Sequence, residues 1–343
     1  MRHLVTGGSG FLGDLIARRL IAKGNEVINA DIWQDNTQPQ SIVFRYCDVT
    51  NQQQVRDAMQ DIDIVHHNAA LVPLTKSGKR FWNVNVEGSR IVAEEAKKAR
   101  VKYFIHMSSS AIFGLPAQCP ITHATPTKPI EIYGQGKLAG EVAVRECLKD
   151  SATQLIVIRP RTILGGSRLG IFQVLFEWIK ENRNVYVIGS GNVDFQFIHA
   201  DDLMSLYMQA MNLGRPGVYN VGTDRFGTLR EALERLIAEV GSTSKVISLP
   251  ERLSISALKT LDFFKLSPLA PWHYLTYHKA FHFDVDPLLN LGWKAKYSND
   301  EMLKESYDFF LKSSVGVGNQ QAAQAIHRKP VKQRLLKFLK KFS

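Results

Sequence analysis

Tyr133 and Lys137 are two residues that together could perform acid–base chemistry. They lie four residues apart in a segment with helical periodicity, so their side chains share one face. A phenol ionises at about pH 10, but a nearby ammonium favours the phenolate and lowers its pKa. Tyr133 could then act as general acid and base for a substrate hydroxyl, while Ser109, at the end of an upstream strand, orients the oxygen. Taken alone, the pair also fits an exposed tyrosine and lysine, and the serine fits a strand end where hydroxyls bond backbone groups.

A glycine-rich turn near the start of the chain could hold a phosphate-containing cofactor. Gly7, Gly10 and Gly13 form a G-x-x-G-x-x-G pattern that follows an apolar strand and opens a helix with Phe11 and Leu12. Glycines let the backbone approach a pyrophosphate, and the helix N-terminus supplies free N–H groups. The motif alone also fits an ordinary strand-to-helix turn.

Asp31 indicates which dinucleotide would bind. It ends the second expected strand, where a carboxylate can accept hydrogen bonds from the adenosine ribose. The same carboxylate would repel a 2′-phosphate, and no Arg or Lys follows before Arg45 to neutralise it. The sequence therefore favours NAD over NADP, with a turn-capping role as the alternative for Asp31.

The elements that must position these residues alternate between short apolar strands and helices. Such alternation predicts a Rossmann-type doubly wound parallel sheet. We expect an NAD-binding domain over 1–165, with its sheet completed by about 195–213. A smaller C-terminal substrate-binding domain would follow over 166–312, and a linker with a basic tail over 313–343. Strands are expected at 3–6, 26–30, 42–46, 62–66, 103–107 and 154–158, and helices at 11–22, from about 52, at 81–99 and at 133–148.

Further motifs resemble one family. They are Cys47-Asp48-Val49, His67-Asn68-Ala69-Ala70, Val84-Asn85-Val86, Ile158-Arg159-Pro160, Phe197 to Leu203 and Leu291-Gly292-Trp293. With the glycine turn and the Ser109, Tyr133 and Lys137 set, they resemble the extended short-chain dehydrogenase/reductases, the NAD-dependent epimerase/dehydratase family, over about residues 1–312. The resemblance implies that Asp48 and Val49 contact the adenine, and that Pro160 lines the nicotinamide. It also implies that Asn68, Ala69, Ala70 and Asn85 lie beside the cofactor, and that Lys137 binds its ribose.

Two departures from the family narrow the expected activity. The 4,6-dehydratase branch carries Asp-Glu after the catalytic Ser or Thr, and Ser110-Ala111 stand there instead, which argues against dehydratase chemistry. Many sugar-nucleotide members carry an arginine for the diphosphate where this chain has Phe195, although Arg161, Arg168 or Lys180 could replace it. Ser110, Arg161 and Phe195 are therefore the candidate substrate-binding residues.

The sequence thus predicts an NAD-dependent epimerase of a nucleotide-linked sugar that acts through a transient ketone. The apolar region from Leu253 to Phe283, a second core or a dimer face, keeps a 3β-hydroxysteroid-dehydrogenase-like oxidoreductase as the alternative. A non-catalytic NAD-sensing or scaffold protein is a third class, which the intact Ser/Tyr/Lys set disfavours. His273, His278 and His282 fit no standard zinc spacing, so no metal site is expected.

Charge and cysteine usage suggest the surroundings of the protein. The formal net charge is +11, but seven of these charges lie in the acid-free tail from Ser313 to Ser343, which leaves a mildly basic body and argues against nucleic acid binding. Val331 to Phe342 fits a basic amphipathic helix at an anionic membrane surface, or one that packs on the body or frays. Three dispersed cysteines favour a reducing compartment. We expect a cytoplasmic homodimer, with possible peripheral contact at the inner membrane surface.

Overall fold

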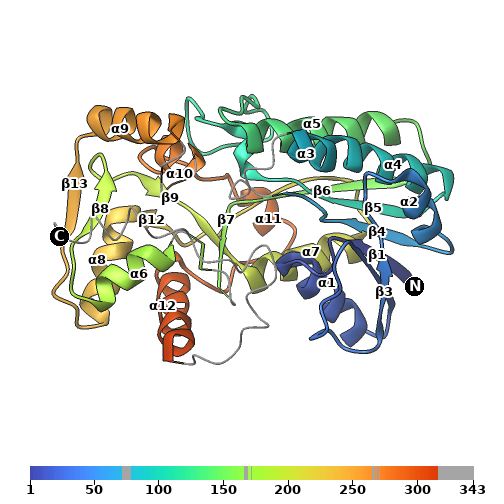
Figure 1. Ribbon diagram of the computed structural model, residues 1–343, viewed down its shortest axis with the longest axis horizontal. Coiled ribbons are helices and arrows are strands. Elements are labelled where there is room, and N and C mark those ends of the chain that lie inside the picture. The colour runs from blue at the N-terminus through green and yellow to red at the C-terminus, as the bar shows by residue number, and fades with distance from the viewer. Residues whose placement is uncertain are drawn as a thin grey trace.

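Seven parallel strands form the central sheet, in the order β11-β6-β5-β4-β1-β2-β3 (Figure 1). The computed structural model describes residues 1–71, 79–165, 169–170, 172–264, 267, 269 and 271–315. The strands are β1 Arg2–Thr6, β2 Glu26–Asp31, β3 Ile42–Tyr46, β4 Ile64–His67, β5 Tyr103–Met107, β6 Gln154–Pro160 and β11 Gly217–Val221. This order confirms the predicted doubly wound Rossmann-type sheet.

The strand that completes the sheet lies later in the chain than the sequence suggested. The expected range 195–213 holds β9 Asp194–Phe195, β10 Phe197–His199 and helix α7 Ala200–Leu213. The apolar β10 resembles a sheet strand, but it pairs only with β7, Thr162–Leu164, outside the main sheet. The seventh strand is β11, which pairs with β6 after α7 has crossed back, because a parallel neighbour requires such a crossover.

Alternate residues of the buried strands face the two helical layers. Val5, Ile64 and Ile105 pack with α1 (Phe11–Ala22) and α7 on one face of the sheet. Leu4, Val65 and Phe104 pack on the other face with α2 (Gln52–Ala58), α4 (Ser89–Lys98) and α5 (Ile132–Leu148). Figure 1 shows the two layers above and below the strands. Because both faces are covered, the strands are continuous apolar runs rather than alternating ones.

The single long helix expected over 81–99 is divided into three segments. It consists of α3 Lys79–Trp82, a π-helical segment Asn83–Gly88 and α4. A π-helical turn inserts an extra residue into the helical repeat and so changes which side chains face inward. Here it holds Asn85 in a buried position, 3% exposed.

A second group of elements packs beside the carboxyl ends of the strands (Figure 1). Its core joins α6, α8 and α12 around Phe176, Leu233 and Tyr307. The elements are α6 Phe172–Lys180, β8 Val185–Ile188, β12 Gly227–Thr228, α8 Leu229–Glu239, β13 Val246–Leu249, α9 Glu251–Phe263, α10 Pro271–Thr276 and α12 Asn299–Val315. The short helix α11, Asp286–Leu289, packs through Leu288 on the core of the main sheet instead. Helix α12 extends to Val315, so the start of the expected linker is helical; the rest of the predicted basic tail lies outside the described residues. Within the part of the chain that the structure describes, no helix is both long and apolar enough to cross a membrane.

The aromatic region between Leu253 and Phe283 is only partly a core. Helix α9 has no fully buried side chain, and Phe263 is 82% exposed, whereas Trp272 and Phe281 are buried. His278 is also buried. Across the described residues, no three or more His, Cys, Asp or Glu side chains gather in a group that could hold a metal ion.

Four buried histidines, His3, His66, His67 and His106, lie on the neighbouring strands β1, β4 and β5. His3 Nδ1 lies 2.8 Å from His66 Nε2, and His66 Nδ1 lies 2.7 Å from the Tyr207 hydroxyl. His67 Nδ1 lies 2.8 Å from Thr6 Oγ1, while its Nε2 lies 2.9 Å from Ser89 Oγ. Ser89 donates its own proton to the Asn85 carbonyl, so His67 Nε2 must be the donor toward Ser89 and Nδ1 the acceptor. His67 is therefore a neutral bridge between β1 and α4.

These histidines should make the fold sensitive to mild acid. Burial holds the pKa values of His66, His67 and His106 well below the usual range, and neighbouring His3, His106 and Lys137 act in the same direction. Because the unfolded chain then takes up protons first, stability is complete above about pH 6.5 and falls below it. The free energy of unfolding should fall by up to about 1.4 kcal/mol per pH unit for each such histidine between about pH 6.5 and 5.

Urea unfolding measured from pH 7.5 to 5 tests this expectation. His106→Phe keeps a ring stacked on His67, whose centroid lies 5.5 Å away, but removes one titrating group. The slope should therefore decrease in this variant. A free energy of unfolding that does not change across this pH range would contradict the assignment.

Candidate active site

The glycine turn between β1 and α1 leaves no room for side chains, which suits close approach of a pyrophosphate. Gly7 has φ +67°, and a Cβ there would lie 2.8 Å from the Ala69 backbone. A Cβ on Gly13 would lie 2.2 Å from the Gly7 carbonyl oxygen. Gly10 is the N-cap of α1 and no side chain caps this helix end, which is the kind of helix N-terminus that can receive an anion. The turn therefore fits a dinucleotide.

Asp31 lies beside this turn, at the end of β2. Its carboxylate accepts hydrogen bonds from the backbone N–H groups of Ser9 at 3.1 Å and Ile32 at 2.7 Å. Burial raises the pKa of Asp31, and these backbone bonds act against that rise. Gln38, which the sequence analysis missed, donates to the Gly8 carbonyl at 2.8 Å and so ties the loop after β2 to the turn.

The segment after β4 is fixed by a buried amide. The Asn85 side chain accepts from the Leu71 N–H at 2.7 Å and donates to the Leu71 carbonyl at 3.0 Å. This clamp holds Asn68, Ala69 and Ala70 against the glycine turn, and the Ala69 N–H donates to Thr6 Oγ1 at 3.4 Å. The contact of Asn85 is thus with the chain itself, and its expected place beside the cofactor stays a prediction.

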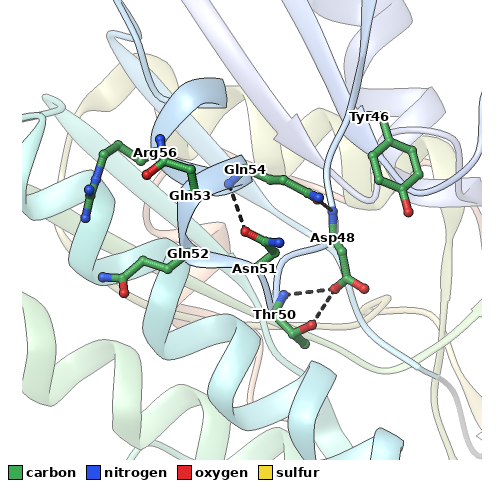
Figure 2. Close-up of a pocket in the computed structure, with 8 residues that line it drawn as sticks. All are labelled: Tyr46, Asp48, Thr50, Asn51, Gln52, Gln53, Gln54 and Arg56. Atoms are coloured by element: carbon green, nitrogen blue, oxygen red, sulfur yellow. Dashed lines mark hydrogen bonds between the residues drawn. The ribbon is translucent and has the colours of Figure 1, made fainter.

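Asp48 and Val49 follow the edge strand β3 and have different surroundings. Val49 is 5% exposed and packs in the core. Asp48 accepts from the Thr50 N–H and hydroxyl, and it borders an open cavity of about 620 Å³ with polar walls (Figure 2). The cavity is lined by Tyr46, Asp48, Thr50, Asn51, Gln52, Gln53, Gln54 and Arg56. Adenine contact by Asp48 and Val49 stays a prediction.

The three serines after β5 have different partners. Ser108 is buried and donates to Glu141 at 2.7 Å. Ser110 is also buried, and its hydroxyl accepts from Arg161 at 3.1 Å. Ser109 alone of the three is half-buried, and its oxygen accepts from the Ala111 N–H at 3.2 Å. Of the three hydroxyls, that of Ser109 is therefore the one best placed to reach a substrate.

The start of α5 brings Tyr133 next to these serines. Glu131 caps the helix by accepting from the N–H groups of Tyr133 at 2.7 Å and Gly134 at 2.6 Å. A Cβ on Gly134 would lie 2.5 Å from the Ala111 carbonyl oxygen, so only glycine lets α5 approach the 3₁₀ helix Ser110–Phe113 this closely. Tyr133 is half-buried, and its ring lies edge-on to Phe81 with centroids 6.5 Å apart.

Lys137 lies one turn later on the same helix and is buried. Its Nζ donates to the Met107 carbonyl at 2.9 Å, at the end of β5. Burial lowers the pKa of Lys137 to about 8, and the charge of Glu141 opposes that shift. The ammonium is therefore the major form at pH 7, beside Ser109 and Tyr133.

Glu141 organises a buried ionic network that the sequence analysis did not identify. Arg159 donates to it twice, at 3.0 and 2.5 Å, and Arg145 donates to it as well. Burial raises the pKa of Glu141, but the bonds from Arg159 and Ser108 outweigh this and hold it below its usual value. The available signal was the spacing of Lys137 and Glu141, four residues apart on one helix.

The structure brings the three candidate substrate-binding residues together. Arg161 contacts Ser110, and its guanidinium carbon lies 5.0 Å from the centre of the Phe195 ring. Arg168 lies outside the described residues. Lys180 is exposed, and its ammonium lies 5.8 Å from the centre of the Phe310 ring, which belongs to the core of the second group of elements. Pro160 ends β6 beside Val221. Ser110 and Arg161 thus follow the carboxyl ends of the parallel strands β5 and β6, where open α/β sheets bind ligands, whereas Phe195 comes from β9, which pairs antiparallel with β12.

Comparisons with known proteins identify the family of the chain. The NAD dependent epimerase/dehydratase family matches residues 3–222. A Sinorhizobium fredii protein, uncharacterized protein y4nG, is 36% identical over 98% of this chain and 85% of its own length. The mouse dTDP-D-glucose 4,6-dehydratase is 25% identical over 91% of this chain and 89% of its own length. A Bacillus cereus UDP-glucuronic acid 4-epimerase, solved with NAD, superposes with a TM-score of 0.73 and 20% identity over 91% of this chain and 99% of that one. The chain therefore belongs to the NAD-dependent epimerase/dehydratase family and is an extended short-chain dehydrogenase/reductase that uses NAD.

Proposed function

We propose that the protein epimerises a nucleotide-linked sugar through a transient ketone. One observation supports this above others: half-buried Ser109 and Tyr133 and buried Lys137 gather at the carboxyl end of β5. The neighbouring strand is β4, and the segment that follows β4 lies against the glycine turn. Curated relatives include nucleotide-sugar epimerases and dehydratases, which supports the substrate class.

The chain's own groups can carry out the proton transfers. Tyr133 would take the proton of the substrate hydroxyl as the carbon is oxidised, and would return it when the ketone is reduced from the opposite face. Ser109 would hold the reacting oxygen. The Lys137 ammonium would favour the Tyr133 phenolate and donate to a ribose hydroxyl of the cofactor. NAD, when bound, supplies the reversible hydride acceptor that such an epimerisation requires.

The residues next to Ser109 favour epimerisation over dehydration. Elimination of water in the dehydratase branch uses an Asp-Glu pair, and Ser110-Ala111 occupy those positions. Ser110 is buried and engaged by Arg161, while Ala111 has no acid–base group. Neither can supply the carboxyl groups.

A second candidate is oxidation of an apolar secondary alcohol, as in 3β-hydroxysteroid dehydrogenases. The observation that favours it is the apolar cluster against which Tyr133 packs, formed by Ala111, Ile112, Phe113, Ile121, Trp272, Phe281, Phe283 and Val285. Such an enzyme would stop at the ketone. It would therefore accumulate NADH, whereas an epimerase would not.

The test is to identify the nucleotide that the purified protein retains and then to follow a panel of nucleotide sugars by NMR. We expect exchange between two sugar isomers with no net NADH. Accumulation of NADH with an apolar alcohol, and no isomer exchange with any sugar, would favour the oxidoreductase instead.

Three further expectations stay predictions. They are that residues 166–312 receive the substrate, that the protein is a homodimer, and that the tail contacts an anionic membrane surface.

A further inference from the structure

Arg161 is a buried cation without an anionic partner among the residues the structure describes. Its side chain is 2% exposed. Nε donates to the Gln196 carbonyl at 3.1 Å and Nη1 to Ser110 Oγ at 3.1 Å. No described residue accepts from Nη2. The guanidinium carbon lies 4.0 Å from the centre of the Phe281 ring, and burial lowers the pKa of Arg161 to about 9.

Arg159, on β6, which ends one residue before Arg161, shows what a structural arginine looks like in this protein. Arg159 is 9% exposed and pairs with the Glu141 carboxylate at 2.5 Å. A buried guanidinium that lacks such a pair lowers the stability of the folded protein. A well-packed apolar residue of similar volume at the same position is often more stable than a buried charge. Arg161 is thus a charge for which the described part of the chain provides no counter-ion.

The position of Arg161 places this charge next to the proposed reacting carbon. Its contact is Ser110, the neighbour of Ser109, which would hold the reacting oxygen. The Phe281 ring beneath Arg161 belongs to the cluster on which Tyr133 packs. In a pyranose, C4 lies across the ring from C1, where the diphosphate is attached, whereas the C5 substituent is adjacent to C4. For epimerisation at C4, a cation beside Ser109 is therefore nearer to the C6 group than to the diphosphate.

We propose that Arg161 is a substrate-binding residue that pairs with a carboxylate at C6, so that the preferred substrate is a nucleotide-linked hexuronic acid. This inference rests on the proposed epimerase function, because that function places the sugar against Ser109. Carboxylates are the natural planar partners of a guanidinium. Among the described residues, no ion pair of Arg161 has to break for the anion to bind, whereas the rings packed against it, those of Phe195 and Phe281, have to move aside.

The test compares substrates that differ only at C6. UDP-glucuronic acid is paired with UDP-glucose, and GDP-mannuronic acid with GDP-mannose, and kcat/KM for epimerisation is measured for each. The wild type should prefer the uronic acid of one pair by about 100-fold, as expected for a charged hydrogen-bonded pair. Arg161→Met should remove this preference by lowering kcat/KM for the uronic acid alone. Arg161→Lys should keep part of the preference, and Arg235→Met, at an exposed arginine of α8, should keep all of it.

Calorimetric binding to the NAD-loaded protein separates the two proposals. Tighter binding of the uronic acid that depends on Arg161, without turnover of any sugar, would refute the epimerase function and leave the role of Arg161 standing. Equal or absent binding of both partners in each pair would overturn the Arg161 inference. An equal loss of kcat/KM for the uronic acid and the neutral sugar in Arg161→Met would also overturn it, because Arg161 would then bind the diphosphate or stabilise the fold. Should Arg161→Met fail to fold, the wild-type preference decides, and preference for the neutral sugar overturns the inference.

Discussion

Tyr133→Phe should lower kcat by about 10³-fold, as expected when a positioned general acid–base group is lost. The phenyl ring keeps the edge-on contact with Phe81 and the packing against the apolar cluster, so the fold and the retained NAD should be unchanged. Only the phenol oxygen is lost, and without it no group of comparable basicity would remain at that position. The measurement is turnover of the identified substrate, together with the NAD content of the purified variant.

Tyr186→Phe is the matched control for this change. Tyr186 lies on β8 in the second group of elements, where its ring packs edge-on against Trp178. The Tyr186→Phe variant should turn over the substrate within about twofold of the wild-type rate, as expected for a substitution away from the active site. Normal turnover in Tyr133→Phe would show that another group moves the proton.

Glu141→Gln should destabilise the protein by about 3–5 kcal/mol, because it leaves the buried Arg159 without its counter-charge. The amide keeps the size of the carboxylate and can still accept a hydrogen bond from Ser108. The loss in free energy of unfolding can therefore be attributed to removal of the charge. Urea unfolding at pH 7.5 measures it. Glu146→Gln, at an exposed position of the same helix, should change stability by less than about 0.5 kcal/mol.

The same variant should alter the pH dependence of activity. The Glu141 charge raises the pKa of Lys137, so its removal should move that pKa below about 8. The ammonium would then be lost at a lower pH, and the basic limb of the kcat profile should shift toward neutral pH. A profile that does not move, with stability lost, would restrict Glu141 to a purely structural role.

The sequence predicted the sheet and the strand-end location of the site because both depend on local signals. The apolar strands, the glycine turn and Asp31 can each be identified from a few consecutive residues. The partners of Arg159 and Arg161 could not be identified from neighbouring residues, because they come from α5 and from the segments around Ser110 and Gln196. Nothing in the Arg159-Pro160-Arg161 run shows that one arginine is paired and the other is not. The place of β11 was missed for a similar reason: β10 has the composition of a sheet strand, and only the three-dimensional pairing excludes it.

The unequal partners of these two arginines also affect how the enzyme can diverge. Loss of Arg159 would leave the buried Glu141 carboxylate without its buried ion-pair partner and with the more exposed Arg145, so selection for a folded protein should preserve Arg159 whatever the substrate. Loss of Arg161 breaks no ion pair with any residue that the structure describes, so a neutral residue could replace it without the same penalty. A single mutation at position 161 could therefore change the substrate preference of this enzyme during evolution while its fold is retained.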